Sequence, residues 1–204
     1  LFVELKTLPQ AWDRVSLLEH TPALQNLASQ IATALDQADS FQETLKHQRV
    51  TQELRLAGQI QTSFLPDHAP DVPGWDIAAS LKPARQTSGD FYDFFYLPEG
   101  RLGILIADVA DKGLGAALYM ALGRTLLLTY AQQYPQNPAA VLHATNQRML
   151  SDARAQMFIT AFYGVLEPDI GRLIYCNAGH HPPLLIRNHA SDLLKRLNPN
   201  GMAL

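Results

Sequence analysis

The chain has 204 residues, of which 47% are hydrophobic and 17% charged, and its formal net charge is −3. This composition is typical of a soluble domain with a real core, and the length leaves room for one additional element. The slight acidity argues against nucleic-acid binding, which usually requires a basic face. No apolar run reaches the roughly 20 residues of a membrane span, and no signal-peptide pattern opens the sequence.

The single cysteine, Cys176, excludes an internal disulfide framework and a multi-cysteine zinc site, which fits a reducing cytoplasm. The chain opens on Leu1 rather than on Met, so we expect it to be a piece of a longer protein. Residues 27–35, Leu-Ala-Ser-Gln-Ile-Ala-Thr-Ala-Leu, resemble the last helix of a GAF-type sensor domain. We therefore interpret residues 1–20 as the possible tail of an upstream sensor.

A heptad seam follows, with apolar or small residues at alternating steps of three and four. The seam residues are Leu24, Leu27, Ile31, Ala34, Ala38, Phe41 and Leu45. Two polar positions, Gln48 and Gln52, continue the seam before a stutter leads to Leu56 and Ile60. The pattern predicts a homodimeric coiled coil through residues 22–64. An amphipathic helix lying on its own domain is the alternative.

The bounds of this helix are predicted from its flanking residues. Thr21 before Pro22 is a favourable helix start, with the threonine as the cap. Pro66 predicts an end near Phe64. Residues 21–65 are therefore expected to form one signalling helix, and residues 66–204 a separate domain.

The second part begins with three prolines and a glycine in residues 66–74, and its pattern then changes to short strands and two helices. Strands are predicted at 75–82, 90–97, 102–108, 157–167, 172–177 and 183–187, with another near 192–197, and helices at 112–133 and 138–153. Short turns join the strands, so we expect an α+β class with a mostly antiparallel sheet. Because strands 91–96 and 158–166 are apolar on both faces, helices and another sheet should cover them.

Two aspartates stand in the first aromatic strand. Asp90 follows Gly89, which lets the backbone approach closely. Asp93 shares a face with Phe91 and Phe95, so its carboxylate must be paired, protonated or bound. In the alternative, Asp90 caps a turn and Asp93 makes local hydrogen bonds.

A hydrophobic strand, residues 102–108, carries Asp108 at its end, and a glycine-bearing turn follows. Two carboxylates at the ends of consecutive strands can face one oxygen-rich site, which suits Mg²⁺ or Mn²⁺ better than zinc. We interpret Asp111 as the cap of the next helix. By themselves, Asp90 and Asp108 could equally be ordinary turn aspartates.

Three segments carry a family resemblance: residues 89–94 (Gly-Asp-Phe-Tyr-Asp-Phe), 106–118 (Ile-Ala-Asp-Val-Ala-Asp-Lys-Gly-Leu-Gly-Ala-Ala-Leu) and 177–183 (Asn-Ala-Gly-His-His-Pro-Pro). In this order they resemble the motifs of SpoIIE/RsbU-type serine/threonine phosphatases, of the metal-dependent type 2C (PPM) family. Residues 59–66 resemble the first helix of that domain. The resemblance spans roughly residues 54–204 and implies a type 2C phosphatase-like α/β sandwich, preceded here by the long coiled-coil helix.

The resemblance implies two Mn²⁺ or Mg²⁺ ions in an aspartate cluster. Asp90 matches the ligand that bridges both ions, Asp108 matches a second ligand, and Val109 contributes its backbone carbonyl. No side chain is implied as catalytic, since a water activated by the ions would attack phosphorus and displace the serine or threonine oxygen. Secondary candidates are Gly89, Asp93, Asn177 and His180; we expect His180 to lie in a structural turn, hydrogen-bonded near the site.

One departure from the family pattern limits these expectations. The remaining ligands of the family lie in Thr-Asp-Gly and Asp-Asp motifs, and nothing after Asn177 supplies them. The resemblance therefore implies that residues 66–204 are a C-terminally truncated and inactive part of the domain. In the parent protein it implies dephosphorylation of phosphoserine or phosphothreonine proteins in cytoplasmic signalling, with a STAS-type anti-sigma-factor antagonist as substrate. The alternative is a non-catalytic dimerising module or pseudophosphatase.

Overall fold

The computed structural model describes residues 14–83, 87–152, 157–186 and 194–204. Contacts within the chain divide it into two compact units, residues 1–50 and 51–204, and each is described by itself. Most of the predicted sensor tail, residues 1–20, lies outside the described residues, so that interpretation stays a prediction.

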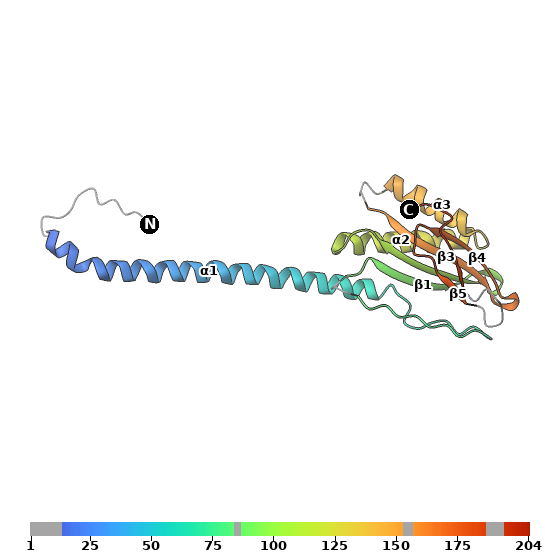
Figure 1. The fold of residues 1–204 in the computed structure, drawn as a ribbon, viewed down its shortest axis with the longest axis horizontal. Coiled ribbons are helices and arrows are strands. Elements are labelled where there is room, and N and C mark those ends of the chain that lie inside the picture. Colours follow the sequence, from blue (N-terminus) through green and yellow to red (C-terminus); the bar gives the residue numbers. More distant parts are fainter. Residues whose placement is uncertain (1–13, 84–86, 153–156, 187–193) are drawn as a thin grey trace. The chain divides into compact units, whose positions relative to one another are not determined.

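Helix α1 spans Arg14–Thr62 and begins earlier than predicted. The expected start at Thr21 was wrong, because Pro22 lies inside the helix. The preceding residues include the helix formers Leu17, Leu18 and Glu19, and an interior proline can kink a helix without ending it. Figure 1 shows the ribbon bending near this end. The helix end at Thr62, before Pro66, confirms the predicted stop within two residues.

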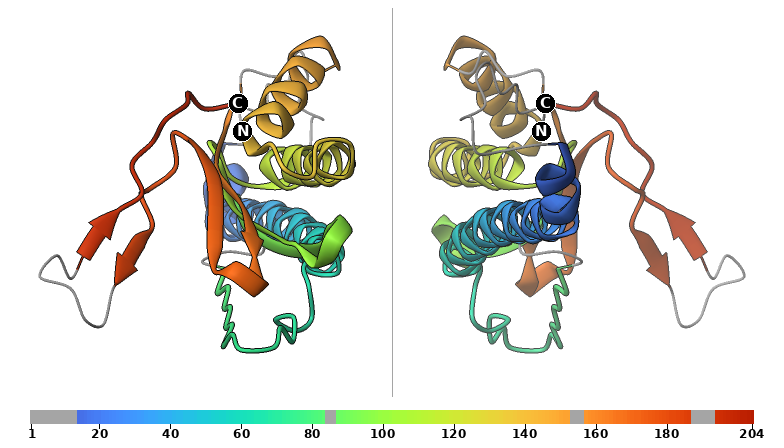
Figure 2. Two further views of the ribbon diagram at one scale, coloured as in Figure 1. Left: turned by 90° about the vertical axis from the view of Figure 1, so that its right-hand side faces the viewer. Right: turned by 90° about the vertical axis from the view of Figure 1, so that its left-hand side faces the viewer.

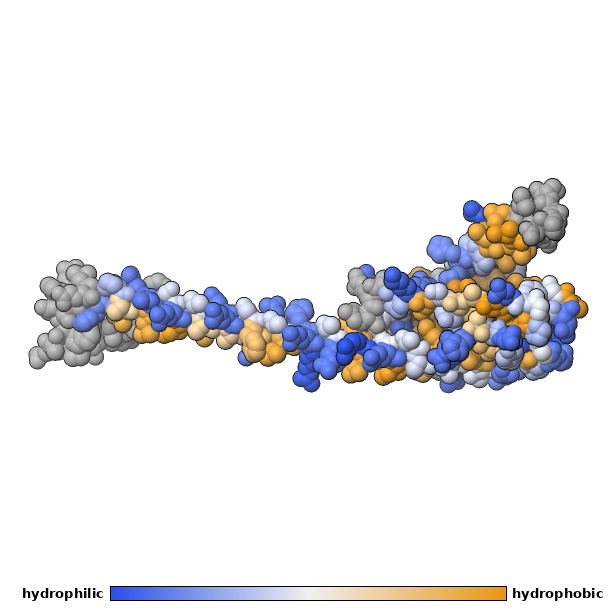
Figure 3. Space-filling view, turned by 90° about the horizontal axis from the view of Figure 1, so that it is seen from below, coloured by the Kyte–Doolittle hydropathy of each residue, from blue (hydrophilic) through white to orange (hydrophobic). Residues whose placement is uncertain are grey.

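The apolar seam of α1 is exposed in the single chain. Its large side chains have exposed fractions of 47–64%: Leu24, Leu27, Ile31, Phe41 and Leu45. Figure 3 shows apolar side chains recurring along the helix between charged ones. Such a long helix is not stable through propensity alone, and most helices gain their stability by burying an apolar face. The seam is therefore an exposed apolar surface along the described part of the helix.

The core of residues 51–204 is one antiparallel sheet of four strands in the order β1-β2-β3-β4 (Figure 1). The strands are β1 (Asp90–Tyr96), β2 (Leu102–Val109), β3 (Ile159–Glu167) and β4 (Arg172–Ala178). All four confirm predicted strands, and consecutive strands are neighbours. The turn between β3 and β4 contains a short 3₁₀ segment, Pro168–Ile170, closed by left-handed Gly171. This confirms the antiparallel α+β prediction.

One predicted strand is absent. Residues 75–82 are not part of a ladder in the described chain, and the segment makes only an isolated bridge between Val72 and Trp75. The reason is that strand alternation is not sufficient without a hydrogen-bonding neighbour. Instead, the Trp75 indole donates a hydrogen bond to the Pro168 carbonyl at 3.2 Å, which fastens the segment to the end of the sheet.

Two helices cover one face of the sheet, α2 (Leu114–Gln133) and α3 (Pro138–Asp152), as Figure 2 shows. Between helices and sheet lies the main core, which includes Phe91, Leu105, Met120, Met149 and Tyr163. By length and composition alone α2 could cross a membrane. Its buried residues and its packing on the sheet are those of a core helix in a globular domain.

The opposite face is covered less completely. A small cluster of Val72, Leu102 and Leu166 covers one part, whereas Ile106 remains 43% exposed and Tyr96 60% exposed. The hairpin of β5 (Leu184–Ile186) and β6 (Leu194–Arg196) forms a separate two-stranded sheet (Figure 2). All residues of its two strands are exposed and the hairpin stands away from the larger sheet, so the expected second covering sheet is not formed by the described residues.

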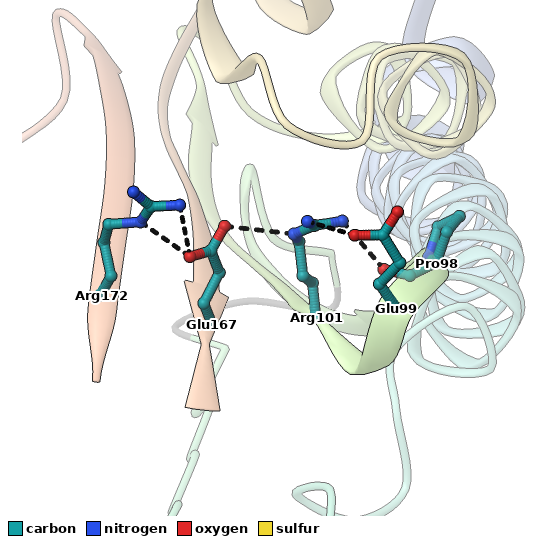
Figure 4. Close-up of polar contacts among 5 residues, drawn as sticks. All are labelled: Pro98, Glu99, Arg101, Glu167 and Arg172. Carbon is teal, nitrogen blue, oxygen red and sulfur yellow. Dashed lines mark hydrogen bonds and ion pairs between the residues drawn. The ribbon is translucent and has the colours of Figure 1, made fainter. Parts of the chain in front are cut away.

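A cluster of charged side chains lies at the end of the sheet where β2 begins and β3 ends (Figure 4). Glu167 lies 3.2 Å from Arg101 and 2.7 Å from Arg172, and Arg101 also contacts Glu99. The guanidinium of Arg172, followed by that of Arg101, lowers the pKa of Glu167. This cluster links β3 and β4 to the segment that precedes β2, at the end of the sheet far from Asp90 and Asp108.

Candidate metal centre

A polar row crosses three strands at one end of the sheet. Asp90 on β1 lies opposite Asp108 on β2, and Asp108 lies opposite Thr160 on β3. The next residue on β1, Phe91, is buried in the core under the helices. Because successive side chains in a strand alternate between faces, the row lies on the face opposite the helices. The structure therefore brings together the two aspartates that the sequence selected.

Gly89 leaves a small cradle beside this row. A Cβ atom on residue 89 would lie 2.7 Å from the Val109 carbonyl oxygen and 2.9 Å from Asp108 Oδ1, with the Asp111 carbonyl at 3.4 Å. The Val109 amide donates to the Gly89 carbonyl at 3.2 Å, which holds the two strand ends together. Three oxygens thus converge on one point that only glycine leaves open. Carboxylate and carbonyl oxygens are the ligands that Mg²⁺ and Mn²⁺ prefer.

The electrostatics of the row favour a cation. Burial raises the pKa of Asp108, and the negative charge of Asp90 raises it further, while His180 and His181 act in the opposite direction. Two like charges so close destabilise each other's ionised form. A divalent cation beside them would remove this repulsion, so the residues present fit the ion that the resemblance implies.

His180 lies at the edge of the row. Its Nδ1 is 2.9 Å from the Thr160 hydroxyl, and its backbone N–H donates to the Asn177 side-chain oxygen at 2.8 Å. Burial lowers the pKa of His180, as does His181, whereas Asp108 and Asp90 raise it. The prediction that His180 sits in a turn, hydrogen-bonded near the site, agrees with this geometry.

Asn177 is fully buried, and both the oxygen and the nitrogen of its side-chain amide make hydrogen bonds. Besides accepting from His180, it donates through Nδ2 to the Leu197 carbonyl at 3.2 Å. Its backbone N–H donates to the Asn200 side chain at 2.7 Å. These contacts give Asn177 a supporting role, holding the turn that carries His180.

Asp93 belongs to the other face of the sheet. Its carboxylate is 3% exposed and lies 2.8 Å from the Arg124 guanidinium, which extends from α2. Oδ1 also accepts from the Phe94 amide at 2.8 Å. The expectation that Asp93 must be paired is met by an ion pair with Arg124, and the side chain is not one of the site's oxygens.

Asp111 does not cap the helix as predicted. The N-cap of α2 is Gly113, and the Asp111 carboxylate accepts instead from the Lys112 amide at 2.8 Å. Asp111 has a φ of 151°, an unfavourable conformation for a residue with a side chain. Its own amide donates to the Val109 carbonyl at 2.9 Å. This tight turn ends two residues before the cap and fixes the Val109 oxygen, whose second lone pair stays available.

Two contributors were missed by the sequence analysis, Thr160 and Gln61. Thr160 is a polar residue in an otherwise apolar strand, and that contrast was a usable signal. Gln61, near the end of α1, is 6% exposed and bonds both backbone groups of Ser88. Nothing in its local sequence distinguishes it from the other glutamines of the helix. No group of three or more His, Cys, Asp or Glu side chains that could hold a metal occurs within the described ranges.

Comparison with known proteins places this geometry in a family. Residues 98–204 match the family described as Stage II sporulation protein E (SpoIIE). Protein IcfG of Synechocystis is 33% identical over 177 residues, which cover 74% of this chain and 28% of that protein. Phosphoserine phosphatase RsbU of Bacillus subtilis is 35% identical over 139 residues, covering 66% of this chain and 40% of RsbU.

Among solved structures, the SiaA-PP2C domain of Pseudomonas aeruginosa matches with a TM-score of 0.62 and 21% identity. The match covers 77% of this chain and 63% of that one, and it shows that the two share a fold. This chain spans well under half the length of both curated relatives. The chain is similar to the phosphoserine phosphatase RsbU and shares its fold with a PP2C domain. With the family match over residues 98–204, the chain belongs to the SpoIIE family.

Proposed function

We propose that the protein to which this chain belongs removes phosphate from phosphoserine or phosphothreonine side chains of a protein substrate in a metal-dependent reaction. The observation that carries this proposal is the convergence of Asp108 Oδ1 and the Val109 carbonyl on the space beside Gly89, opposite Asp90. A family resemblance alone would not specify which oxygens face one another. Here the oxygen set matches the preference of Mn²⁺ and Mg²⁺.

In this proposal Asp90, Asp108 and the Val109 carbonyl hold the ions, two in the complete domain. Bound divalent ions supply charge to the phosphoryl oxygens and lower the pKa of water. The chain's own contribution is preorganisation. Gly89 keeps the space beside the oxygens open, and the bond between the Val109 amide and the Gly89 carbonyl fixes the two strand ends.

The relatives support our choice of substrate. RsbU carries the name phosphoserine phosphatase, and we assign this protein the same bond class. We further propose a STAS-type anti-sigma-factor antagonist as the protein that carries the phosphoserine, and a cytoplasmic setting for the reaction. Secondary roles are assigned to His180 and Asn177, which build the turn beside the row.

The exposed seam of α1 supports a homodimer through residues 22–64. A second copy offers the same seam, and parallel pairing buries the large apolar residues of both helices. Gln48 and Gln52 would meet their own copies in the polar stretch of the seam, which favours a matched register over a shifted one. In this arrangement α1 conveys a signal from an upstream domain to residues 51–204.

The experiment is hydrolysis of a phosphoserine protein by the whole parent protein, with and without Mn²⁺, beside its Asp90→Asn variant. The proposal predicts Mn²⁺-dependent release of phosphate that the variant loses by several orders of magnitude. Equal rates in the two proteins would exclude the assigned ligand. Absence of hydrolysis in both, with an intact dimer, would favour the alternative of a non-catalytic dimerising module or pseudophosphatase, which the exposed seam of α1 also fits.

A further inference from the structure

The buried ion pair between Asp93 and Arg124 lies between the strand that carries Asp90 and the helix layer. Asp93 is 3% exposed and Arg124 20% exposed, and the charged atoms are 2.8 Å apart. The surroundings are apolar: in the register of the sheet, Asp93 lies next to Leu105, which lies next to Tyr163, and both are fully buried. An ionised carboxylate in such surroundings requires a partner.

Stability alone does not account for this pair. Replacing a buried ion pair by apolar side chains of similar volume is often neutral or stabilising. What a buried charge pair adds is a defined position, since each charge is strongly destabilised when its partner is removed. Burial raises the pKa of Asp93, and Arg124 lowers it. The hydrogen bond from the Phe94 amide also lowers the pKa, but burial is the larger effect and the pKa of Asp93 stays above its ordinary value.

The position of Arg124 matters because helix α2 links the two strands that carry the candidate ligands. Helix α2 begins at Leu114, shortly after Asp108 and Val109 at the end of β2. Arg124 of the same helix contacts Asp93 on β1. Asp93 is three positions from Asp90, which is roughly 10 Å along the strand. One rigid helix is thus joined covalently to one ligand-bearing strand and by an ion pair to the other.

We propose that Asp93 and Arg124 are positioning residues. They fix the position of Asp90 along β1 relative to Asp108 and Val109 on β2. The pair works through α2, whose start is fixed by the tight turn after Val109. The functional consequence of this inference rests on the proposed metal site. The position of Asp90 relative to Asp108 and Val109 does not depend on a bound ion.

Two backbone hydrogen bonds report on this effect from opposite ends of the β1–β2 pair. At the site, the Val109 amide donates to the Gly89 carbonyl at 3.2 Å. At the far end, the Leu97 amide donates to the Arg101 carbonyl at 2.8 Å. Amide hydrogen exchange at these two residues, in the metal-free 204-residue chain, separates a local change at the site from a general loss of stability.

The test compares Arg124→Gln and Asp93→Asn with Glu167→Gln, which breaks a similar ion pair at the far end of the same sheet. The proposal predicts that each of the first two lowers protection of the Val109 amide about tenfold more than protection of the Leu97 amide. Glu167→Gln should not show this selectivity. In the whole parent protein, the same two variants should weaken Mn²⁺ binding by about 10- to 100-fold, the usual effect of losing a supporting contact.

Arg124→Lys keeps the charge and should restore much of the Val109 protection. If Arg124→Gln does not fold, Asp93→Asn and Asp93→Glu allow the same comparison of the two amides. Parallel loss at Val109 and Leu97 in every folded variant would overturn the proposal. Selective loss at Val109 in a protein whose wild type binds no Mn²⁺ would support the positioning role and reject the proposed metal function.

Discussion

The side-chain amide of Gln61 makes hydrogen bonds to both the backbone N–H and the backbone carbonyl of Ser88. The Ser88 amide donates to Gln61 Oε1 at 3.0 Å, and Gln61 Nε2 donates to the Ser88 carbonyl. The Ser88 hydroxyl in turn accepts from the Asp90 amide at 3.1 Å. The last turns of α1 are therefore joined to the segment that carries the first candidate ligand.

Replacing Gln61 by alanine should destabilise residues 51–204. The change removes two hydrogen bonds and leaves polar backbone groups in a part-buried setting, which costs about 1–3 kcal/mol. Urea unfolding of the Gln61→Ala variant measures this loss. Gln59→Ala, at an exposed position of the same helix, is the matched control. If both variants unfold at the same urea concentration, the two bonds contribute nothing to stability.

Gly89→Ala should close the cradle. Its Cβ would lie 2.7 Å from the Val109 oxygen and 2.9 Å from Asp108 Oδ1, closer than packed atoms approach, so the two strand ends must separate. We expect a loss of about 1–3 kcal/mol in unfolding free energy, as for other overpacked sites. We also expect loss of Mn²⁺ binding in the parent protein, measured by calorimetry. Gly115→Ala, where an added Cβ meets only one methionine carbon at 4.0 Å, should retain binding; equal binding in both variants would contradict the cradle.

The cluster at the far end of the sheet predicts a pH dependence of stability. Arg172 and Arg101 lower the pKa of Glu167 below its ordinary value of 4.5, so the ionised carboxylate stabilises the fold. That stabilisation is complete above about pH 4.5 and is lost as the pH falls through the lower folded-state pKa. Thermal unfolding should show wild type more stable than Glu167→Gln at pH 7, with the difference shrinking in acid. A difference that grows as the pH falls would show that the sign is wrong.

The seam of α1 predicts self-association. A charge at Ile31 or Leu45, both about half exposed in the single chain, would face its own copy in a parallel dimer and disrupt it. Sedimentation should show a dimer for the wild type and a monomer for the Ile31→Glu and Leu45→Glu variants. Gln37→Glu, outside the seam and exposed, should remain a dimer. A wild-type monomer at high concentration would reject the coiled coil.

Much of the fold was predictable because its signals are local. The aromatic strand at Asp90, the hydrophobic strand ending at Asp108 and the Pro-Asp-Ile-Gly turn all carry their own periodicity or turn chemistry. The predicted strand at residues 75–82 failed because strand formation depends on a neighbour that alternation cannot reveal. The predicted start at Thr21 failed because a favourable cap does not end the helical preference of the residues before it.

The site was predictable only in part for the same reason. Asp90 and Asp108 occupy strand ends, and the ordered motifs around them supplied their roles. Arg124 was overlooked, although a lone cation in a helix rich in alanine and leucine indicates a buried partner. The Gln61–Ser88 contact spans 27 residues, and no pattern within either segment predicts it.

The central claim is that Asp90, Asp108 and the Val109 carbonyl form a divalent-metal site. The most direct test is a Mn²⁺ titration of the parent protein, followed by electron paramagnetic resonance, for the wild type and for Asp90→Asn, Asp108→Asn and Asp169→Asn. The last substitution alters an exposed aspartate in the turn after β3, away from the row. We predict that Asp90→Asn and Asp108→Asn each weaken binding at least about tenfold, while Asp169→Asn binds as the wild type does. Undiminished binding in both the Asp90→Asn and Asp108→Asn variants would contradict the assignment.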